Sequence, residues 1–311
     1  MKALGIDIGG TRIKAGVVDS DGNILEQRTG ASPRTLDEFH EAMLRLTTGL
    51  PVSELAGVGV GCKGIISPAG TTVEVLPGTM HFLEGHALSE FLALGLPIYA
   101  DNDARVAMAG EMVWGAARNR SEAVMLTLGT GVGGAIVAGG KLLRGATGVA
   151  GHLGHYTVDP DGPVCICGNH GCLETYFSAP AIEAQAIDAV RRGVASSLTE
   201  HFGRAPEKIT CQAVFDAAAQ GDPLAARIVS QAIRKLAGAI AGVLLMLDPE
   251  IVILGGQITQ AGRFLLDPLA EEVQWRSHLM LRRDVPIVLQ HVADPSGIVG
   301  AAALFFTSHR T

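Results

Sequence analysis

The sequence lacks any long run of basic residues, and its 24 Lys and Arg are outnumbered by 31 Asp and Glu, for a net charge of −7. A dedicated nucleic-acid-binding face needs a basic patch that meets the phosphates, so this charge balance argues against one. Long hydrophobic runs are also missing: the longest apolar stretch, residues 240–247, falls far short of the roughly 20 residues that span a bilayer. Neither nucleic acid nor a membrane is therefore an expected partner.

Cysteines are scarce as well. There are five in 311 residues, which argues against a disulfide framework. No leader pattern is visible, because Met1 and Lys2 run directly into a strand-like segment without a small-residue cleavage site. We therefore expect a cytoplasmic protein. What the sequence does have is an apolar fraction of 48%, enough for a sizeable core, and 40 glycines, which imply many tight turns or ligand-facing loops.

Strand-like and helix-like segments alternate along the chain, which predicts an α/β fold. The length favours two domains or one large one. Strands are expected at residues 3–8, 12–19, 23–28, 56–62, 97–100, 123–128, 134–138 and 251–254. Helices are expected at residues 35–48, 102–114, 178–192, 212–219, 223–247 and 297–306.

A weak internal repeat joins LGIDIGGTRIKAGVVDSDG, which starts at Leu4, with LTLGTGVGGAIVAGG, which starts at Leu126. Both stretches read as an apolar strand, a Gly/Thr turn and a second apolar strand. Two similar hairpins about 120 residues apart indicate duplicated halves around a shared cleft. Such a cleft is a favoured place for a small ligand.

The glycines of the second hairpin match G-x-G-x-x-G, but they do not fit a dinucleotide site. That fingerprint needs a following helix and an acidic residue about 20 positions on, whereas residues 135–158 hold no Asp or Glu. No G-x-x-x-x-G-K-[ST] loop occurs either. Glycine turns admit phosphate close to backbone N–H groups, and Asp7 has the oxygen ligands that Mg²⁺ prefers. The alternative is two ordinary hairpin turns. The turns in question are Gly9-Gly10-Thr11 and Gly129-Thr130-Gly131, with a third glycine pair at Gly255-Gly256.

Three of the five cysteines gather in one short segment, at Cys165, Cys167 and Cys172, and His155 precedes them by ten residues. Three thiolates and one imidazole suit a tetrahedral Zn²⁺, and four protein ligands leave no open position, so the zinc is expected to be structural. The alternative is a disulfide between two of these cysteines. The remaining two, Cys62 and Cys211, are expected to be buried as small apolar residues.

A third cluster, Asp101-Asn102-Asp103, lies where a short strand gives way to a helix. A carboxylate at a strand end can accept the proton of a hydroxyl during phosphoryl transfer. Asp and Asn are also common helix caps, so capping is the alternative.

These motifs together resemble the ROK family of sugar kinases and sugar-responsive repressors, within the actin/hexokinase-like ATPase superfamily. The resemblance rests on Asp7 to Thr11, residues 126–134 and Cys165 to Glu174, and it runs to residues 294–303 near the end of the chain. It implies a two-lobed, ribonuclease H-like α/β fold with a central cleft. The small lobe would hold residues 1–115 and about 292–311, the large lobe residues 116–291 with a zinc loop at 151–174. A homodimer is also implied.

The activity implied is ATP-dependent phosphorylation of a sugar hydroxyl, the 6-OH of a hexose, an amino sugar or another modified hexose. Asp103 would be the general base, and the cofactors ATP, Mg²⁺ and structural Zn²⁺. The sugar contacts implied are Gly64, Asn102, His152, His155 and Glu174. The ATP and phosphate contacts implied are Asp7 (with Mg²⁺), Gly9, Gly10, Thr11, Lys14, Gly129, Thr130, Gly131, Gly133, Gly255 and Gly256.

Several positions depart from the family pattern. The family's E-N-D-A-N appears here as Asp101-Asn102-Asp103-Ala104-Arg105, so Arg105 places a cation near the cleft. His152 replaces a sugar-binding Glu. A neutral imidazole both donates and accepts hydrogen bonds, whereas a carboxylate only accepts. Lys63 stands where Pro usually precedes the glycine, and Thr79 where Asn is usual. The sugar-side segments carry these changes and the ATP motifs do not, so we expect an acceptor other than plain glucose.

Two other functions compete with a kinase. Sugar-responsive regulators of the family carry an N-terminal helix-turn-helix domain, whereas this sequence begins at the first strand of the ATPase pattern. A zinc hydrolase that uses His152 and His155 would need the Glu of H-E-x-x-H, which is absent. The sequence therefore favours the kinase, with donor preference and acceptor left open.

Overall fold

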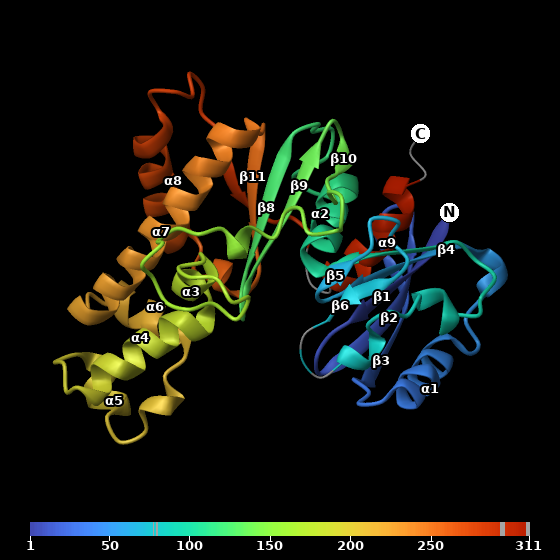
Figure 1. The fold of residues 1–311 in the computed structure, drawn as a ribbon, viewed down its shortest axis with the longest axis horizontal. Coiled ribbons are helices and arrows are strands. Elements are labelled where there is room, and N and C mark those ends of the chain that lie inside the picture. The colour runs from blue at the N-terminus through green and yellow to red at the C-terminus, as the bar shows by residue number, and fades with distance from the viewer. Residues whose placement is uncertain (77, 79, 293–295, 309–311) are drawn as a thin grey trace. The chain divides into compact units, whose positions relative to one another are not determined.

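The structure, a computed structural model, describes residues 1–76, 78, 80–292 and 296–308. Its chain divides into two compact units and forms two five-stranded sheets together with helices, so the predicted α/β class is confirmed (Figure 1). The first unit comprises Met1–Ser121, Ala135–Gly151 and Gln290–Thr311, and the second comprises Glu122–Gly134 and His152–Leu289. The lobe boundaries expected from the sequence, at residues 115/116 and 291/292, stay a prediction.

The first sheet has the strand order β3-β2-β1-β4-β7. Its members are β1 (Lys2–Ile8), β2 (Arg12–Asp19), β3 (Ile24–Ala31), β4 (Leu55–Cys62) and β7 (Ile98–Asn102). Strand β1 runs antiparallel to β2 and parallel to β4, and β4 runs parallel to β7. Both β1 and β4 are buried almost throughout, as expected for central strands covered on both faces, while the burial of edge strand β3 alternates.

Helices cover both faces of this sheet. On one face Leu4 and Ile6 share a core with Phe39 and Met43 of α1 (Leu36–Thr47). On the other lie α2 (Asp103–Trp114) and α9 (Ser296–Ser308). The backbone of α9 packs directly on the strands, because a Cβ on Gly5 would lie only 2.0 Å from the carbonyl oxygen of Ile298. A short sheet of β5 (Ile65–Ile66) and β6 (Val73–Val75) adjoins.

The second sheet has the order β10-β9-β8-β11-β12. Its strands are β8 (Ala123–Leu128), β9 (Val132–Ala138), β10 (Lys141–Leu142), β11 (Ile251–Gly255) and β12 (Ile287–Leu289). The helices of the second unit are α3 (Glu174–Phe177), α4 (Ala179–Arg191), α5 (Ser197–Phe202), α6 (Cys211–Ala219), α7 (Pro223–Leu247) and α8 (Arg263–Ser277). Short 3-10 helices occur at Val52–Glu54, His81–Leu83, Leu88–Glu90, Leu153–His155, Pro206–Lys208 and Gln257–Ala261.

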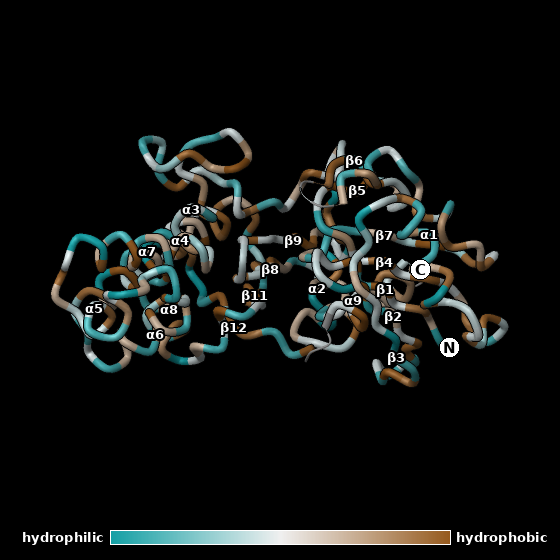
Figure 2. Tube along the Cα trace, turned by 90° about the horizontal axis from the view of Figure 1, so that it is seen from below, coloured by the Kyte–Doolittle hydropathy of each residue, from teal (hydrophilic) through white to brown (hydrophobic). Residues whose placement is uncertain are grey.

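Helix α7 is the long core helix of the second unit. Asp222 caps its start by accepting the N–H of Ala225 at 2.9 Å, and Asp248 ends it in the left-handed conformation with φ 44°. Within the described residues α7 alone is long and apolar enough to cross a membrane, but 61% of that window is buried within the fold. Hydrophilic residues instead gather on α5 and the loop after it (Figure 2).

The predicted helices at 35–48, 102–114, 212–219 and 223–247 are confirmed within a residue or so at each end. The one expected at 178–192 is confirmed as α4, whose start is capped by Ser178: its Oγ accepts the N–H of Ala181 at 3.3 Å. The short helix α3, which ends just before Ser178, was missed. Helix α8 was missed. Pro268 lies inside it, and a proline in a sequence pattern argues against a continuous helix. The short strands β5, β6, β10 and β12 were missed as well.

Candidate active site

The parallel strands β1, β4 and β7 end at one edge of the first sheet, where Ile8, Cys62 and Asn102 lie side by side in register. Asp7 is half-buried just before this edge, and Asp103 is exposed just beyond it as the first residue of α2. Burial raises the pKa of the Cys62 thiol to about 12, and the negative charges of Asp103 and Asp7 add to the rise. Both carboxylates therefore act on the same edge of the sheet.

Asn102 is held by the backbone at both ends of its amide. Its Oδ1 caps α2 by accepting the N–H of Ala104 at 3.0 Å, and its Nδ2 donates to the carbonyl of Gly64 at 2.8 Å. Gly64 has φ +85°, and a Cβ there would lie 2.0 Å from the carbonyl oxygen of Val75. The structure thus ties Gly64 to the strand–helix junction and confirms capping for Asn102. Its sugar contact stays a prediction.

Asp103, the predicted general base, is the exposed first residue of α2, and its catalytic role stays a prediction. Its side chain projects from the start of α2, and its Oδ1 accepts the N–H of Ala104 at 2.9 Å. A helix N-terminus favours the ionised carboxylate, because the partial positive charge of the first N–H groups lies beside it. An exposed, ionised carboxylate can accept a proton from a bound hydroxyl.

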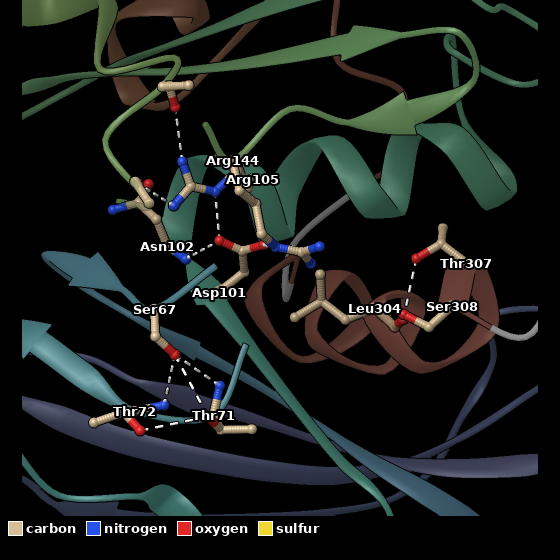
Figure 3. A network of polar contacts seen from close by, with 12 residues as sticks. Ser67, Thr71, Thr72, Asp101, Asn102, Arg105, Arg144, Leu304, Thr307 and Ser308 are labelled. Carbon is tan, nitrogen blue, oxygen red and sulfur yellow. Dashed lines mark hydrogen bonds and ion pairs between the residues drawn. The ribbon is translucent and has the colours of Figure 1, made fainter. Parts of the chain in front are cut away.

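Arg105 was expected as a cation near the cleft, and its guanidinium does not face solvent. Its side chain is fully buried and is ion-paired with Asp101, itself buried. Arg144 bonds the other oxygen of Asp101, with Nε to Oδ2 at 2.7 Å (Figure 3). The positive charge that Arg105 adds is therefore paired with the buried carboxylate of Asp101.

The Gly9–Thr11 turn connects β1 to β2. The N–H of Gly9 donates to the carbonyl of Arg12 at 3.1 Å, and Lys14 lies directly opposite Asp7 in the ladder. A Cβ on Gly10 would meet no atom within 4 Å, so protein packing does not require glycine there. Gly297 at the start of α9 packs against Asp7: a Cβ on it would lie 2.5 Å from Asp7 Oδ2. Asp7, the Gly9–Thr11 turn and the start of α9 thus lie next to one another.

The second glycine turn connects β8 to β9 and repeats this arrangement. The N–H of Gly129 donates to the carbonyl of Gly131 at 3.0 Å, and the N–H of Ala179 donates to the carbonyl of Gly129 at 2.8 Å. Glu174 Oε2 accepts the N–H of Val132 at 2.8 Å. A Cβ on Gly129 would again meet nothing within 4 Å. Hydrogen bonds with Ala179 and Glu174 thus hold the turn, while no atom of the described residues fills the space where a Gly129 side chain would lie.

A pocket of about 520 Å³ opens beside this turn within the second unit. Gly129 and Thr130 line one part of it, and Gln257 and Ile258, directly after Gly256, line another. Gly256 has φ +89° and approaches the end of β8 closely, since a Cβ on it would lie 2.4 Å from the carbonyl oxygen of Leu128. The rest of the wall comes from α4, α6 and their neighbours: Ala179, Glu183, Thr210, Cys211, Gln212, Phe215, Asp216, Gln260 and Ala261.

The cysteine cluster comes together as its spacing predicted. The ligand atoms of His155, Cys165, Cys167 and Cys172 all lie within 4.8 Å of one another, and no disulfide joins them. Burial raises the pKa of the Cys165 and Cys172 thiols, while the N–H of Asn169 lowers that of Cys167. One imidazole and three sulfurs so close together fit the donor set of a structural Zn²⁺. Cys62 and Cys211 are buried singly, as predicted.

The remaining predicted residues take ordinary backbone positions. His152 is half-buried before the 3-10 turn Leu153–His155, and its carbonyl accepts the N–H of His155 at 3.0 Å. Gly133 lies in β9, Gly255 ends β11, and Lys63 is exposed. Thr79 lies outside the described residues.

Comparison with known proteins decides the family. A family model described as the ROK family matches residues 3–308. The chain belongs to the ROK family. A glucokinase of Thermotoga maritima is 36% identical over 98% of this chain and 97% of its own. An N-acetylmannosamine kinase of Escherichia fergusonii is 33% identical over 98% of each chain. The structure of a ROK family glucokinase from Streptomyces griseus in complex with glucose and AMPPNP matches with a TM-score of 0.79 at 32% identity, covering 98% of this chain and 99% of that one.

Membership of the ROK family confirms the resemblance and, with it, the actin/hexokinase-like ATPase fold. Four residues of the pocket wall were not predicted from the sequence: Glu183, Gln212, Phe215 and Asp216. These residues come from two helices that are separate in sequence, and no local motif marks them. A helical wheel of α4 or α6 finds the buried side of each helix, but not which exposed residues share a pocket.

The open space over Gly129 makes a direct prediction for this ROK family member. Gly129→Ala should raise the KM for ATP at least about tenfold while leaving the melting temperature unchanged, because the methyl group displaces a phosphate oxygen and no protein atom. Steady-state kinetics and thermal melts measure the two effects. Gly238→Ala in α7, also with nothing within 4 Å, is the matched control and should leave the KM unchanged. An unaltered KM in Gly129→Ala would contradict a phosphate site at this turn.

Proposed function

We propose that this chain is an ATP-dependent sugar kinase, which transfers the γ-phosphoryl group of ATP to a hydroxyl group of a hexose, an amino sugar or another modified hexose. The observation that carries the proposal is the pocket of about 520 Å³ beside the open turn at Gly129 and Thr130. Its volume falls within the about 300–1,000 Å³ of small-molecule sites, and the turn offers backbone N–H groups where a phosphate chain would continue. Relatives named glucokinase and N-acetylmannosamine kinase support the same reaction.

The pocket suits a nucleoside better than a polyanion. Among its described lining residues are the carboxylates Glu183 and Asp216 and the ring of Phe215, and no Lys or Arg. Carboxylates accept hydrogen bonds from ribose hydroxyls, and an aromatic ring can stack on a base. A chain of phosphates would meet two negative charges instead. We therefore propose ATP as the donor.

Asp103 supplies the acid–base chemistry in this proposal. The hydroxyl oxygen of the sugar attacks the γ-phosphorus, the bond from phosphorus to the β–γ bridging oxygen breaks, and the hydroxyl proton passes to the Asp103 carboxylate. The products are the sugar phosphate and ADP. Gly64, Asn102, His152, His155 and Glu174 are the proposed sugar contacts, with the Gly9–Thr11 and Gly129–Gly131 turns on the phosphates.

Two metals belong to the proposal. Asp7 offers carboxylate oxygens beside a phosphate turn and would hold Mg²⁺, which neutralises charge on the phosphates when bound. His155 and the three cysteines of the cluster would hold structural Zn²⁺, with all four positions taken by the protein.

A phosphorylation assay across hexoses, amino sugars and deoxy sugars tests the function, with NMR of the product to identify the phosphorylated hydroxyl. We expect ATP-dependent turnover with at least one sugar, and an acceptor other than glucose to have the highest kcat/KM. His152 is the physical reason, since its ring can donate a hydrogen bond that the carboxylate usual at this position cannot. No turnover with any sugar would contradict the kinase. Glucose as the best substrate would contradict only the acceptor.

A further inference from the structure

Arg105 occupies an unusual environment for a charged residue on the first turn of a helix. Its side chain is fully buried, and it is two residues beyond the proposed base Asp103. Arginine is almost never buried completely unless its charge and its donors are paired, because the desolvation of the guanidinium must be repaid. The groups that Arg105 contacts therefore indicate the structural role of this buried charge.

The guanidinium of Arg105 uses its three nitrogens on two separate segments. Nε bonds Asp101 Oδ1 on β7, which also accepts the N–H of Asn102 at 2.9 Å. Nη1 donates to the carbonyl of Ala150 at 2.8 Å, and Nη2 donates to the carbonyl of Gly148 at 3.0 Å. Figure 3 shows the Asp101 carboxylate between the guanidinium groups of Arg105 and Arg144.

The segment that Arg105 holds, residues 144–150, has no helix or strand of its own. Within it, the N–H of Ala150 donates to the carbonyl of Arg144 at 3.2 Å. Gly145 and Gly148 have positive φ of 73° and 83°, and a Cβ on Gly148 would lie 2.1 Å from the carbonyl oxygen of Ile66. Arg144, the first residue of the segment, bonds Asp101 directly. Arg105 of α2 bonds the same carboxylate and also the carbonyls of Gly148 and Ala150 near the end of the segment, so both ends of the segment are anchored to Asp101.

These contacts join the parts of the first unit on which the sugar proposal depends. Asn102 ties Gly64 to the start of α2, and Arg105 ties residues 148–150 to the same turn. The chain then continues through Gly151 into His152. The Gly9–Thr11 turn is held by other contacts: the N–H of Gly9 donates to the carbonyl of Arg12, and Gly297 packs against Asp7.

We propose that Arg105 is a positioning residue for sugar binding. Through its bonds to Asp101 and to the carbonyls of Gly148 and Ala150, it fixes the position of residues 144–150 relative to the start of α2, where Asp103 lies. The inference rests on the proposed function, because it concerns the acceptor side of the same site. Lysine cannot replace it. An ammonium group can neutralise Asp101 but lacks the planar fork that reaches a carboxylate and two carbonyls at once.

Arg105→Lys tests the inference. We expect the KM for the best acceptor of the sugar panel to rise about tenfold or more, the KM for ATP to stay within about twofold, and kcat at saturating sugar to fall much less than tenfold. Calorimetric titration of the sugar without ATP should show a matching loss of affinity. Since a buried substitution can impair folding, Arg144→Gln is the second variant. Arg144 is partly exposed and anchors the same segment, so a smaller rise in the sugar KM is expected.

Glu111→Gln is the matched control for simple destabilisation. Glu111 is also buried on α2, but its carboxylate accepts the N–H groups of Ala116, His291 and Val292 and none from residues 144–150. It should lower the melting temperature and leave the sugar KM unchanged. An unchanged sugar KM in both arginine variants, or an equal rise in Glu111→Gln, would overturn the inference while the kinase activity of the unmodified chain still stood. Inactivity of the unmodified chain with every sugar would instead overturn the proposed function.

Discussion

Asp103→Asn should lower kcat by about 100- to 10,000-fold, the range that a general base contributes. The amide has nearly the shape of the carboxylate and keeps an oxygen that can accept the N–H of Ala104, so α2 should still start at the same residue. It cannot take the proton of the attacking hydroxyl. We therefore expect the Kd of the sugar to stay within about threefold while turnover collapses. Rapid-quench or coupled kinetics with calorimetry of sugar binding would measure both quantities.

The control for this prediction is Asp37→Asn. Asp37 is an exposed carboxylate in the first turn of α1, so it shares with Asp103 the favourable position at a helix N-terminus. Each substitution should lower the free energy of unfolding by about 0.3–1 kcal/mol, because the helix dipole loses a negative neighbour. Only Asp103→Asn should lose turnover. Near-normal kcat in Asp103→Asn would show that another group accepts the proton.

Cys172→Ser should remove about one equivalent of zinc per chain and lower the melting temperature by more than about 5 °C, because metal binding and local folding are coupled. Activity should also fall at least about tenfold. Two contacts connect the cluster to the Gly129–Gly131 turn and explain the loss of activity. Glu174, two residues after Cys172, accepts the N–H of Val132, the residue after this turn. Gly154, just before His155, packs on the Val132 carbonyl. A Cβ on Gly154 would lie 1.9 Å from that oxygen.

Metal analysis of the reduced protein as purified, together with thermal melts, measures these effects. Cys211→Ser is the control for metal content, since Cys211 is a buried thiol that does not belong to the cluster. It should keep its zinc. Freshly purified, reduced protein that holds no zinc would contradict the assignment of the cluster, as would a Cys172→Ser variant that retains the metal.

The parts of the site that could be predicted from sequence are those set by local spacing. Cys165, Cys167 and Cys172 lie within eight residues, so a loop can bring their sulfurs together whatever the rest of the chain does. The glycine turn at Gly9 was likewise readable, because a hairpin between apolar strands follows from the order of residues alone. Helix α2 and its cap at Asn102 follow from the same kind of local signal.

Other features could not be predicted because their partners are distant in sequence. Arg105 was expected as a cation near the cleft, and its burial follows from contacts with residues more than 40 positions away. The pocket beside Gly129 forms where α4, α6 and the turn after β11 come together, and no sequence motif in those segments predicts it. Helix α8 was not predicted because of Pro268 in its sequence, although packing against α7 stabilises the helix.

The sequence by itself determined the α/β class, the family, the metal-type cluster and the base candidate, because each depends on residue types at short spacing. Only the tertiary structure decided that Asp101 and Arg105 form one buried pair, that Arg144 joins them, and that the space over Gly10 and Gly129 is open. The physical reason is that burial, charge pairing and empty space are properties of several segments packed together. A linear pattern specifies each segment, but the interactions between segments appear only when the chain has folded.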